Sequence, residues 1–328
     1  EFVVSSLEHL YDIEKITTFL KVFSLKRSEI EPYRFYTSPN LLINYPIFDS
    51  DDNFFVIPYV KQLIHAIYKE LTSFGKSLGD RFYRQRGKFL QEKIIQVLSN
   101  YFGETTLIFN EYHTSLTSED QDVLLLSEGL AIIIEAKAGR EPDPRRDGNV
   151  KDSFKAIVQY FVRNIQSGYD QASRIINLLN QKKDFEVLDK KGQVIHKVHS
   201  GDYQSAFSFI ITLDKFREVQ MNLNHLLQLG KDDKYPISMC IDDFEVLMLT
   251  LKKIGVNNSK FTSFCKLRQS LQGRVAETCD ELSIWADFIL NEKFSIPSDP
   301  HYHFVPSVVG ADLFDDLYKK GLGFKNEK

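Results

Sequence analysis

The sequence predicts an α/β protein, in which β-strands alternate with helices. Two apolar runs, 122–126 and 130–137, flank a short Ser-Glu-Gly turn, a pattern typical of a buried β-hairpin. Apolar residues at helical spacing precede this hairpin at 88–101 and follow it at 154–180. A very apolar run at 207–213 has the composition of a strand in the middle of a sheet.

The first segment, residues 1–80, is predicted to be an α/β extension. Its apolar spacing is compatible with a helix over 6–23, and four prolines then mark loops or short strands. A second helix is predicted at 60–74, with an apolar stripe along one face. Residues 75–80 form a natural joint, so we expect a domain boundary near residue 80.

The second segment, residues 81–213, is the predicted core. It begins with the helix 88–101, which Gly103 follows. We expect the remaining elements in this order: a strand at 105–113, the hairpin, a polar loop at 138–153, a helix over 154–180 that is interrupted near Ser167-Gly168, a hairpin at 185–198 and the strand at 207–213.

The third segment, residues 214–328, is predicted to be a mostly helical C-terminal extension. Asp242 and Glu245 have the spacing of a capping box, which places a helix from there to about Lys253. Further helices are expected at 261–272 and 280–292.

Within the two apolar runs of the central hairpin, charged residues stand only at the open end. Asp122 begins the first strand, and the turn folds the second strand back so that Glu135 and Lys137 lie near the same end. Because Glu135 and Lys137 are two residues apart in a strand, their side chains point to one face. Three such charges cost free energy unless they are paired or bind a metal. Two carboxylates suit Mg²⁺, and with an ammonium they are the minimal set for metal-dependent hydrolysis of a phosphodiester.

Asp122, followed by Glu135-Ala136-Lys137 at the end of the next strand, resembles the core of the PD-(D/E)XK nuclease superfamily, which has the restriction-endonuclease-like fold. The resemblance covers roughly residues 86–213. It implies a core of helix, three strands, helix and strand, with a mixed central sheet flanked by helices. Gln121 stands where the family name has Pro, a residue that many members lack.

The resemblance implies a bound Mg²⁺ or Mn²⁺ and a role for each residue of the motif. Asp122, Glu135 and the carbonyl of Ala136 would hold the metal, and Lys137 would position the attacking water. Glu92, on the first core helix, matches a further acid that often contacts the metal in the family.

Many members of the family also place a Gln on the helix after the Lys, where it touches substrate or positions that Lys. Gln171 matches this residue, and Gln159 is an alternative. An ordinary helix-surface Gln is the competing interpretation, as a surface ion pair is for Glu135 and Lys137.

The formal net charge of −4 does not by itself indicate a nucleic-acid-binding protein. Basic residues nevertheless gather on both sides of the predicted site, where phosphates would have to lie. They are either phosphate contacts or solvated charges of loops. The six candidates for nucleic-acid binding are Arg84, Arg86, Lys88, Arg140, Arg145 and Arg146.

Composition and short motifs exclude several classes of protein and indicate a cellular location. No apolar run reaches the length of a membrane span, and no basic region precedes an apolar stretch at the N-terminus. Three cysteines without a Cys-x-x-Cys pair favour reduced thiols and a cytoplasmic location. No phosphate-binding loop of an ATPase and no Gly-x-Ser-x-Gly are found.

The sequence therefore predicts a Mg²⁺-dependent deoxyribonuclease that acts on DNA rather than RNA. The alternative is a catalytically inactive module on the same fold that binds nucleic acid or a protein. A homo-oligomer or a partner protein remains possible in either case.

Overall fold

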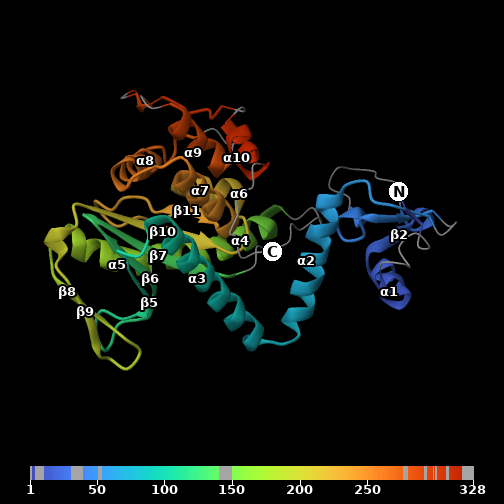
Figure 1. Cartoon of the computed structure of the whole chain (residues 1–328), viewed down its shortest axis with the longest axis horizontal. Coiled ribbons are helices and arrows are strands. Elements are labelled where there is room, and N and C mark those ends of the chain that lie inside the picture. The colour runs from blue at the N-terminus through green and yellow to red at the C-terminus, as the bar shows by residue number, and fades with distance from the viewer. Residues whose placement is uncertain are drawn as a thin grey trace. The chain divides into compact units, whose positions relative to one another are not determined.

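The structure of the protein is a computed structural model, shown in Figure 1. It describes residues 2–3, 11–30, 40–50, 54–139, 150–275, 280–291, 294–297, 299, 301–307 and 310–319. The chain divides into two compact units, one formed by residues 1–84 and 144–153, the other by residues 85–143 and 154–328. The first division falls close to the boundary expected near residue 80.

The first unit is a small sheet with two helices. Its strand order is β1-β4-β3-β2, with β2 and β3 parallel and the other pairs antiparallel. Ile16, Leu20 and Phe23 of α1 pack with Ile47 and Phe55 of the strands. The elements are β1 (Phe2–Val3), α1 (Ile13–Phe23), β2 (Ser24–Lys26), β3 (Ile47–Asp49), β4 (Phe54–Val56) and α2 (Val60–Lys76), with 3-10 turns at Arg27–Glu29 and Leu41–Ile43.

The second unit is built on a mixed five-stranded sheet of order β11-β10-β7-β6-β5. Neighbours among β5, β6 and β7 are antiparallel, whereas β7, β10 and β11 run parallel. A separate hairpin pairs β8 with β9. The strands are β5 (Leu107–Tyr112), β6 (Gln121–Ser127), β7 (Leu130–Lys137), β8 (Phe185–Leu188), β9 (Val194–Val198), β10 (Ser205–Thr212) and β11 (Ile237–Cys240).

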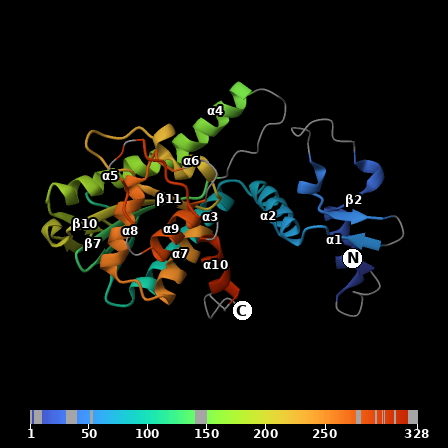
Figure 2. The ribbon, with the colours of Figure 1, turned by 90° about the horizontal axis from the view of Figure 1, so that it is seen from above.

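Helices cover both faces of this sheet (Figure 2). The order α3, β5, β6, β7, α5, β10 reproduces the predicted succession of helix, three strands, helix and strand. The helices are α3 (Asp80–Phe102), α4 (Val150–Phe161), a π-helical turn (Val162–Gln166), α5 (Ser167–Asn180), α6 (Arg217–Met221), α7 (Ile241–Lys253), α8 (Asn258–Ser270), α9 (Glu281–Leu290) and α10 (Gly310–Lys319). No helix in the described ranges is long and apolar enough to cross a membrane.

The apolar runs of the hairpin are explained by burial on both sides. Alternate residues of a strand point to opposite faces. Val123 of β6 joins the core that α3 covers, through Leu90 and Ile94. Leu124 joins the core that α5 covers, through Ala172. Because neither face meets water, β6 and β7 are almost continuously apolar.

The described residues of the segment 214–328 belong to the second unit and share its main core. Phe244 and Trp285 are in the same cluster of buried side chains as Ile134 and Phe209. Strand β11, which the sequence analysis did not predict, adds the fifth strand beside β10.

The predicted capping box is wrong. Strand β11 runs directly into α7, so the helix begins at Ile241 and its cap position is Cys240, with no side-chain capping bond. Asp242 therefore lies within the first turn, where a carboxylate still interacts favourably with the helix dipole.

Candidate active site

The site begins where β6 and β7 separate. The two strands pair from Ser127 opposite Leu130 to Val123 opposite Ile134. One residue further on, the Asp122 carboxylate accepts a hydrogen bond from the backbone N–H of Ala136, at 2.7 Å from Oδ2. This carboxylate thus takes the place of a strand carbonyl, and the bond fixes it beside the end of β7.

A side chain from α3 holds the other oxygen of Asp122. The Gln91 amide donates from Nε2 to Oδ1 of Asp122, at 2.5 Å. Leu90 and Ile94 of the same helix are buried in the core, so Gln91, next to Leu90, faces the edge of the sheet. The Asp122 carboxylate is therefore held from two directions and has one defined position.

The structure does not bring Glu92 to this cluster. Its carboxylate pairs with Lys88 at 3.7 Å, and both side chains are exposed. Successive residues of a helix are about 100° apart, so the residue after Gln91 points away from the edge of the sheet. Gln91 occupies the place that the sequence analysis assigned to Glu92.

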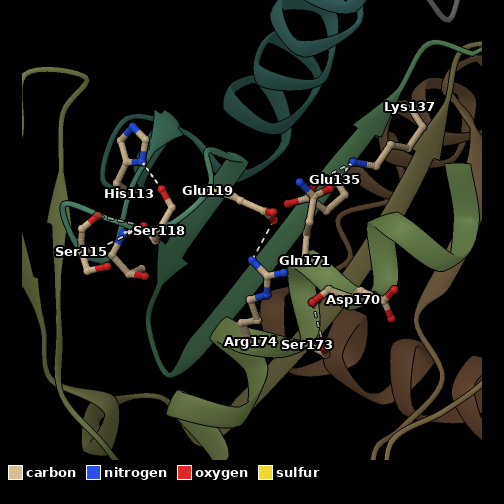
Figure 3. A network of polar contacts seen from close by, with 11 residues as sticks. His113, Ser115, Ser118, Glu119, Glu135, Lys137, Asp170, Gln171, Ser173 and Arg174 are labelled. Carbon is tan, nitrogen blue, oxygen red and sulfur yellow. Dashed lines mark hydrogen bonds and ion pairs between the residues drawn. The ribbon is translucent and has the colours of Figure 1, made fainter. Parts of the chain in front are cut away.

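Lys137 joins the two strands to α5, as Figure 3 shows. Its ammonium donates to Oε2 of Glu135 at 2.9 Å and to Oε1 of Gln171 at 2.5 Å. The same nitrogen lies 3.9 Å from Oδ2 of Asp122. Gln171 is thus the residue that contacts the lysine, whereas Gln159 is exposed on α4. The structure therefore brings Asp122, Glu135, Lys137 and Gln171 to one point.

The charges of this cluster are strongly coupled. Glu135 is buried, with 1% of its side chain exposed. This burial raises the pKa of Glu135 to about 8, with a further contribution from Asp122, although the Lys137 ammonium acts in the opposite direction. The raised pKa favours a Glu135 side chain that keeps its proton at neutral pH.

Sequence reasoning missed two buried polar residues of the site. The Gln121 amide, with its nitrogen turned toward its acceptors, donates to the Gln171 carbonyl at 3.2 Å and to Oε1 of Glu135 at 3.3 Å. The Tyr112 hydroxyl is buried and makes no hydrogen bond within the described part of the chain. Burial, together with the charges of Glu135 and Asp122, raises the pKa of this tyrosine. One feature of the sequence could have indicated Gln121: it is a polar residue at the start of an otherwise apolar strand.

Helix α5 approaches the site closely because one of its residues is a glycine. A Cβ at Gly168 would lie 3.1 Å from Cε of Lys137 and 3.2 Å from Cγ2 of Ile210. A larger residue would therefore press on the stem of the lysine.

The six basic residues that were predicted to bind nucleic acid do not share one environment. Arg86 is buried and its guanidinium pairs with Asp214 at 3.2 Å, so it is not on an open surface. Lys88 is exposed and pairs with Glu92, and Arg84 is exposed in the first unit. The remaining three, Arg140, Arg145 and Arg146, lie outside the described residues.

The donor set fits a hard divalent cation. In the described ranges no group of three or more His, Cys, Asp and Glu side chains could hold a metal ion. Two carboxylates do meet, and Mg²⁺ takes only one or two carboxylates and completes its shell with water. Asp122 and Glu135, whose carboxylates both lie beside the Lys137 ammonium, match that requirement.

No family model matches the chain, and no curated protein matches it. Among solved structures, the chain is similar to the small subunit of the heterodimeric restriction endonuclease R.BspD6I, at 15% identity and a TM-score of 0.28. The similarity covers 58% of this chain and 87% of that chain.

Proposed function

We propose that this chain is a metal-dependent nuclease that hydrolyses phosphodiester bonds, with DNA as its expected substrate. One observation carries the proposal. Asp122, Glu135 and Lys137, from two adjacent strands, meet at a single point, with the Lys137 nitrogen 2.9 Å from Glu135 and 3.9 Å from Asp122. Two carboxylates and an ammonium supply a cation site and a positive group beside the phosphate.

The arrangement of elements supports a restriction-endonuclease-like core. An antiparallel set β5-β6-β7 is followed by a helix and by a strand, β10, parallel to β7. This is the order that the family resemblance implies, and the charged cluster lies at the ends of β6 and β7 where the motif requires it. The PD-(D/E)XK assignment is part of the proposal.

Asp122, Glu135 and the carbonyl of Ala136 would hold Mg²⁺ or Mn²⁺. Without a cation, burial and the neighbouring carboxylate leave Glu135 with its raised pKa of about 8. A divalent cation would offset the repulsion between the two carboxylates, so metal binding and ionisation of Glu135 are linked. When bound, the ion supplies positive charge that polarises the phosphoryl group and lowers the pKa of a water molecule.

Lys137 and Gln171 would position the attacking water. An ammonium has three N–H donors. Two of them donate to Glu135 and Gln171, and we assign the third to the water. Gln171 holds the lysine in place from α5, and Gln91 holds Asp122 from α3. Both glutamines are positioning residues, because they act through the side chains that they contact.

Purified protein, incubated with Mg²⁺ or Mn²⁺, tests the proposal on plasmid, linear duplex and single-stranded DNA and on RNA. We expect cleavage of DNA that EDTA abolishes. Lys137→Ala should lower the cleavage rate by a factor of 10² or more, on the order of the loss for one positioned catalytic group, while DNA binding persists.

Lys266→Ala is a suitable control, because Lys266 is an exposed lysine on α8 and is remote in sequence from the motif. Unchanged cleavage in Asp122→Ala would overturn the site. Binding of nucleic acid without metal-dependent turnover would favour the alternative, an inactive binding module on the same fold.

A further inference from the structure

Helix α5 carries an arginine just beyond the glutamine that holds Lys137. Gln171 contacts the Lys137 ammonium, and Arg174 follows three residues later. Residues three apart in a helix are neighbours on one face, offset by about 4.5 Å along the axis. The side chains of Gln171 and Arg174 therefore leave the helix on the same side.

The segment that leads into β6 meets this face of α5 at two points. The Gln121 amide donates to the Gln171 carbonyl at 3.2 Å. Two residues earlier, Oε2 of Glu119 accepts from Nη1 of Arg174 at 2.8 Å, as Figure 3 shows. Because Asp122 directly follows Gln121, the Arg174 guanidinium lies next to the proposed site and not on a distant surface.

The ion pair between Arg174 and Glu119 is open to solvent. The exposed fractions of the two side chains are 52% and 62%. An exposed pair of this kind contributes little to stability. The carboxylate of Asp170, four residues before Arg174, instead accepts from Nε2 of Gln166 at 2.9 Å. A ligand that binds a guanidinium more strongly than an exposed carboxylate does can therefore displace Glu119.

Glu119 stays within reach of Arg174 because its loop is braced on both sides. Nδ1 of His113 lies 3.0 Å from the Ser118 carbonyl oxygen, and Nε2 of the same ring lies 2.6 Å from the Asp120 carboxylate. The residues before and after Glu119 are thus fixed by one histidine. Its carboxylate is held where it competes for the arginine.

We propose that Arg174 binds the phosphate of DNA that neighbours the one being cleaved, and that Glu119 occupies the guanidinium in the free protein. A guanidinium donates two parallel hydrogen bonds to a phosphate. Successive phosphates of one strand rise about 3.4 Å along a duplex, which is close to the offset between Gln171 and Arg174. This inference rests on the proposed nuclease function and extends it to the substrate.

Binding of a duplex DNA oligonucleotide in EDTA, where the DNA stays intact, tests the contact. Arg174→Gln should raise Kd by roughly eightfold at about 0.1 M salt and reduce the slope of log K against log salt by about 1, which is the contribution of one phosphate contact. Glu119→Gln should lower Kd by about two- to fivefold, because the phosphate no longer has to displace an ion pair.

The hairpin β8–β9 supplies a matched control. Lys197→Gln and Glu186→Gln break another exposed ion pair, of 3.2 Å, with the same changes of charge. Each should leave Kd within about twofold, because distant exposed charges are screened. In Arg174→Gln/Glu119→Gln the gain from Glu119→Gln should disappear, since Glu119 acts through the arginine.

The outcomes separate this contact from the nuclease itself. Equal Kd values for Arg174→Gln and Lys197→Gln, or weaker binding by Glu119→Gln, would show that the ion pair only tethers the loop, and the contact is overturned. In Mg²⁺, Arg174→Gln should raise KM more than it lowers kcat. Wild type that binds DNA through Arg174 without cleaving it overturns the nuclease alone, and wild type that does not bind DNA overturns both.

Discussion

Asp122 has two tasks that can be separated by mutation. Its Oδ2 accepts the hydrogen bond of the Ala136 N–H that the strand ladder leaves without a carbonyl, and its charge belongs to the proposed cation site. An amide in the same place would keep the first task and lose the second. Asp122 is therefore part of the sheet and part of the proposed cation site.

We expect Asp122→Asn and Asp122→Ala to abolish cleavage alike but to differ in stability. The Asn oxygen can still accept from Ala136, whereas Ala leaves that N–H unsatisfied, at a cost of about 1–2 kcal/mol. Urea unfolding of both variants, without divalent ions, measures the difference. Equal stability of the two would show that the bond to Ala136 contributes nothing.

Glu135 makes the stability of the protein dependent on pH. Its pKa is raised in the folded state to about 8 from an ordinary 4.5. The folded state therefore binds more protons between these two values, and the free energy of unfolding falls as pH rises from about 4.5 to about 8. Below about pH 4.5, Glu135 is protonated in both the folded and the unfolded state, so it does not change the free energy of unfolding.

Glu135→Gln should remove this part of the pH dependence, because the amide is neutral throughout. In EDTA, we expect the variant to gain stability relative to wild type between pH 6 and pH 9, by a few kcal/mol at most. Mg²⁺ added at pH 9 should stabilise wild type and not the variant. Urea midpoints at the two pH values check both outcomes, and an identical pH slope in the two proteins would contradict the assignment.

At the scale of elements, the site depends on how closely α5 approaches the sheet. The helix contributes Gln171 to Lys137, and Gly168 leaves room for the stem of that lysine. A π-helical turn, Val162–Gln166, joins α4 to α5 just before Gly168. Such turns are frequent beside functional sites. The sequence analysis placed an interruption at Ser167-Gly168, next to this turn.

Gly168→Ala should lower activity more than stability. Alanine favours a helix interior over glycine by about 1 kcal/mol, which offsets part of the strain of a Cβ 3.1 Å from Cε of Lys137. We expect unfolding free energy within about 1 kcal/mol of wild type and a clearly reduced turnover rate. Gly201→Ala, where a Cβ meets nothing within 4 Å, is the matched control. Full activity of Gly168→Ala would show that the lysine adjusts freely.

At the scale of the whole molecule, the hydrophobic core decides where the second unit ends. Trp285 and Phe288 of α9 are fully buried with Phe209 of β10 in one cluster. A chain that stopped at Leu213 would expose this face of the sheet to water. The segment 214–328 is therefore required for folding, although it contributes none of the site residues proposed above.

Truncation tests this division. We expect a chain of residues 80–328 to fold and to keep the proposed site, since it contains the second unit. A chain of residues 80–213 should be insoluble or lack a cooperative unfolding transition, because it loses much of its core. Circular dichroism and thermal melts measure both, and a cooperative melt for residues 80–213 would contradict the shared core.

The sequence by itself determined the central hairpin and the identity of the charged cluster. Apolar runs broken by Ser127-Glu128-Gly129 can form little else than a buried hairpin, and period-two geometry then places Glu135 and Lys137 on one face. Strand β7 was predicted with its observed limits, Leu130–Lys137. These features depend on the order of apolar and polar residues within a short segment, which can be read directly from the sequence.

Only the tertiary structure decided which side chains complete the site and which segments complete the core. Gln91 and Glu92 are adjacent polar residues, and the rotation of α3 on the sheet selects the first. Gln121, the first residue of β6, reaches Glu135 and Gln171 with its amide, which only the packing of α5 on the sheet brings together. The pairing of strand β11 with β10 and the burial of Trp285 likewise follow from contacts between separate elements of the chain. Such contacts leave no periodic signal in the sequence, because they arise from packing between elements and not within them.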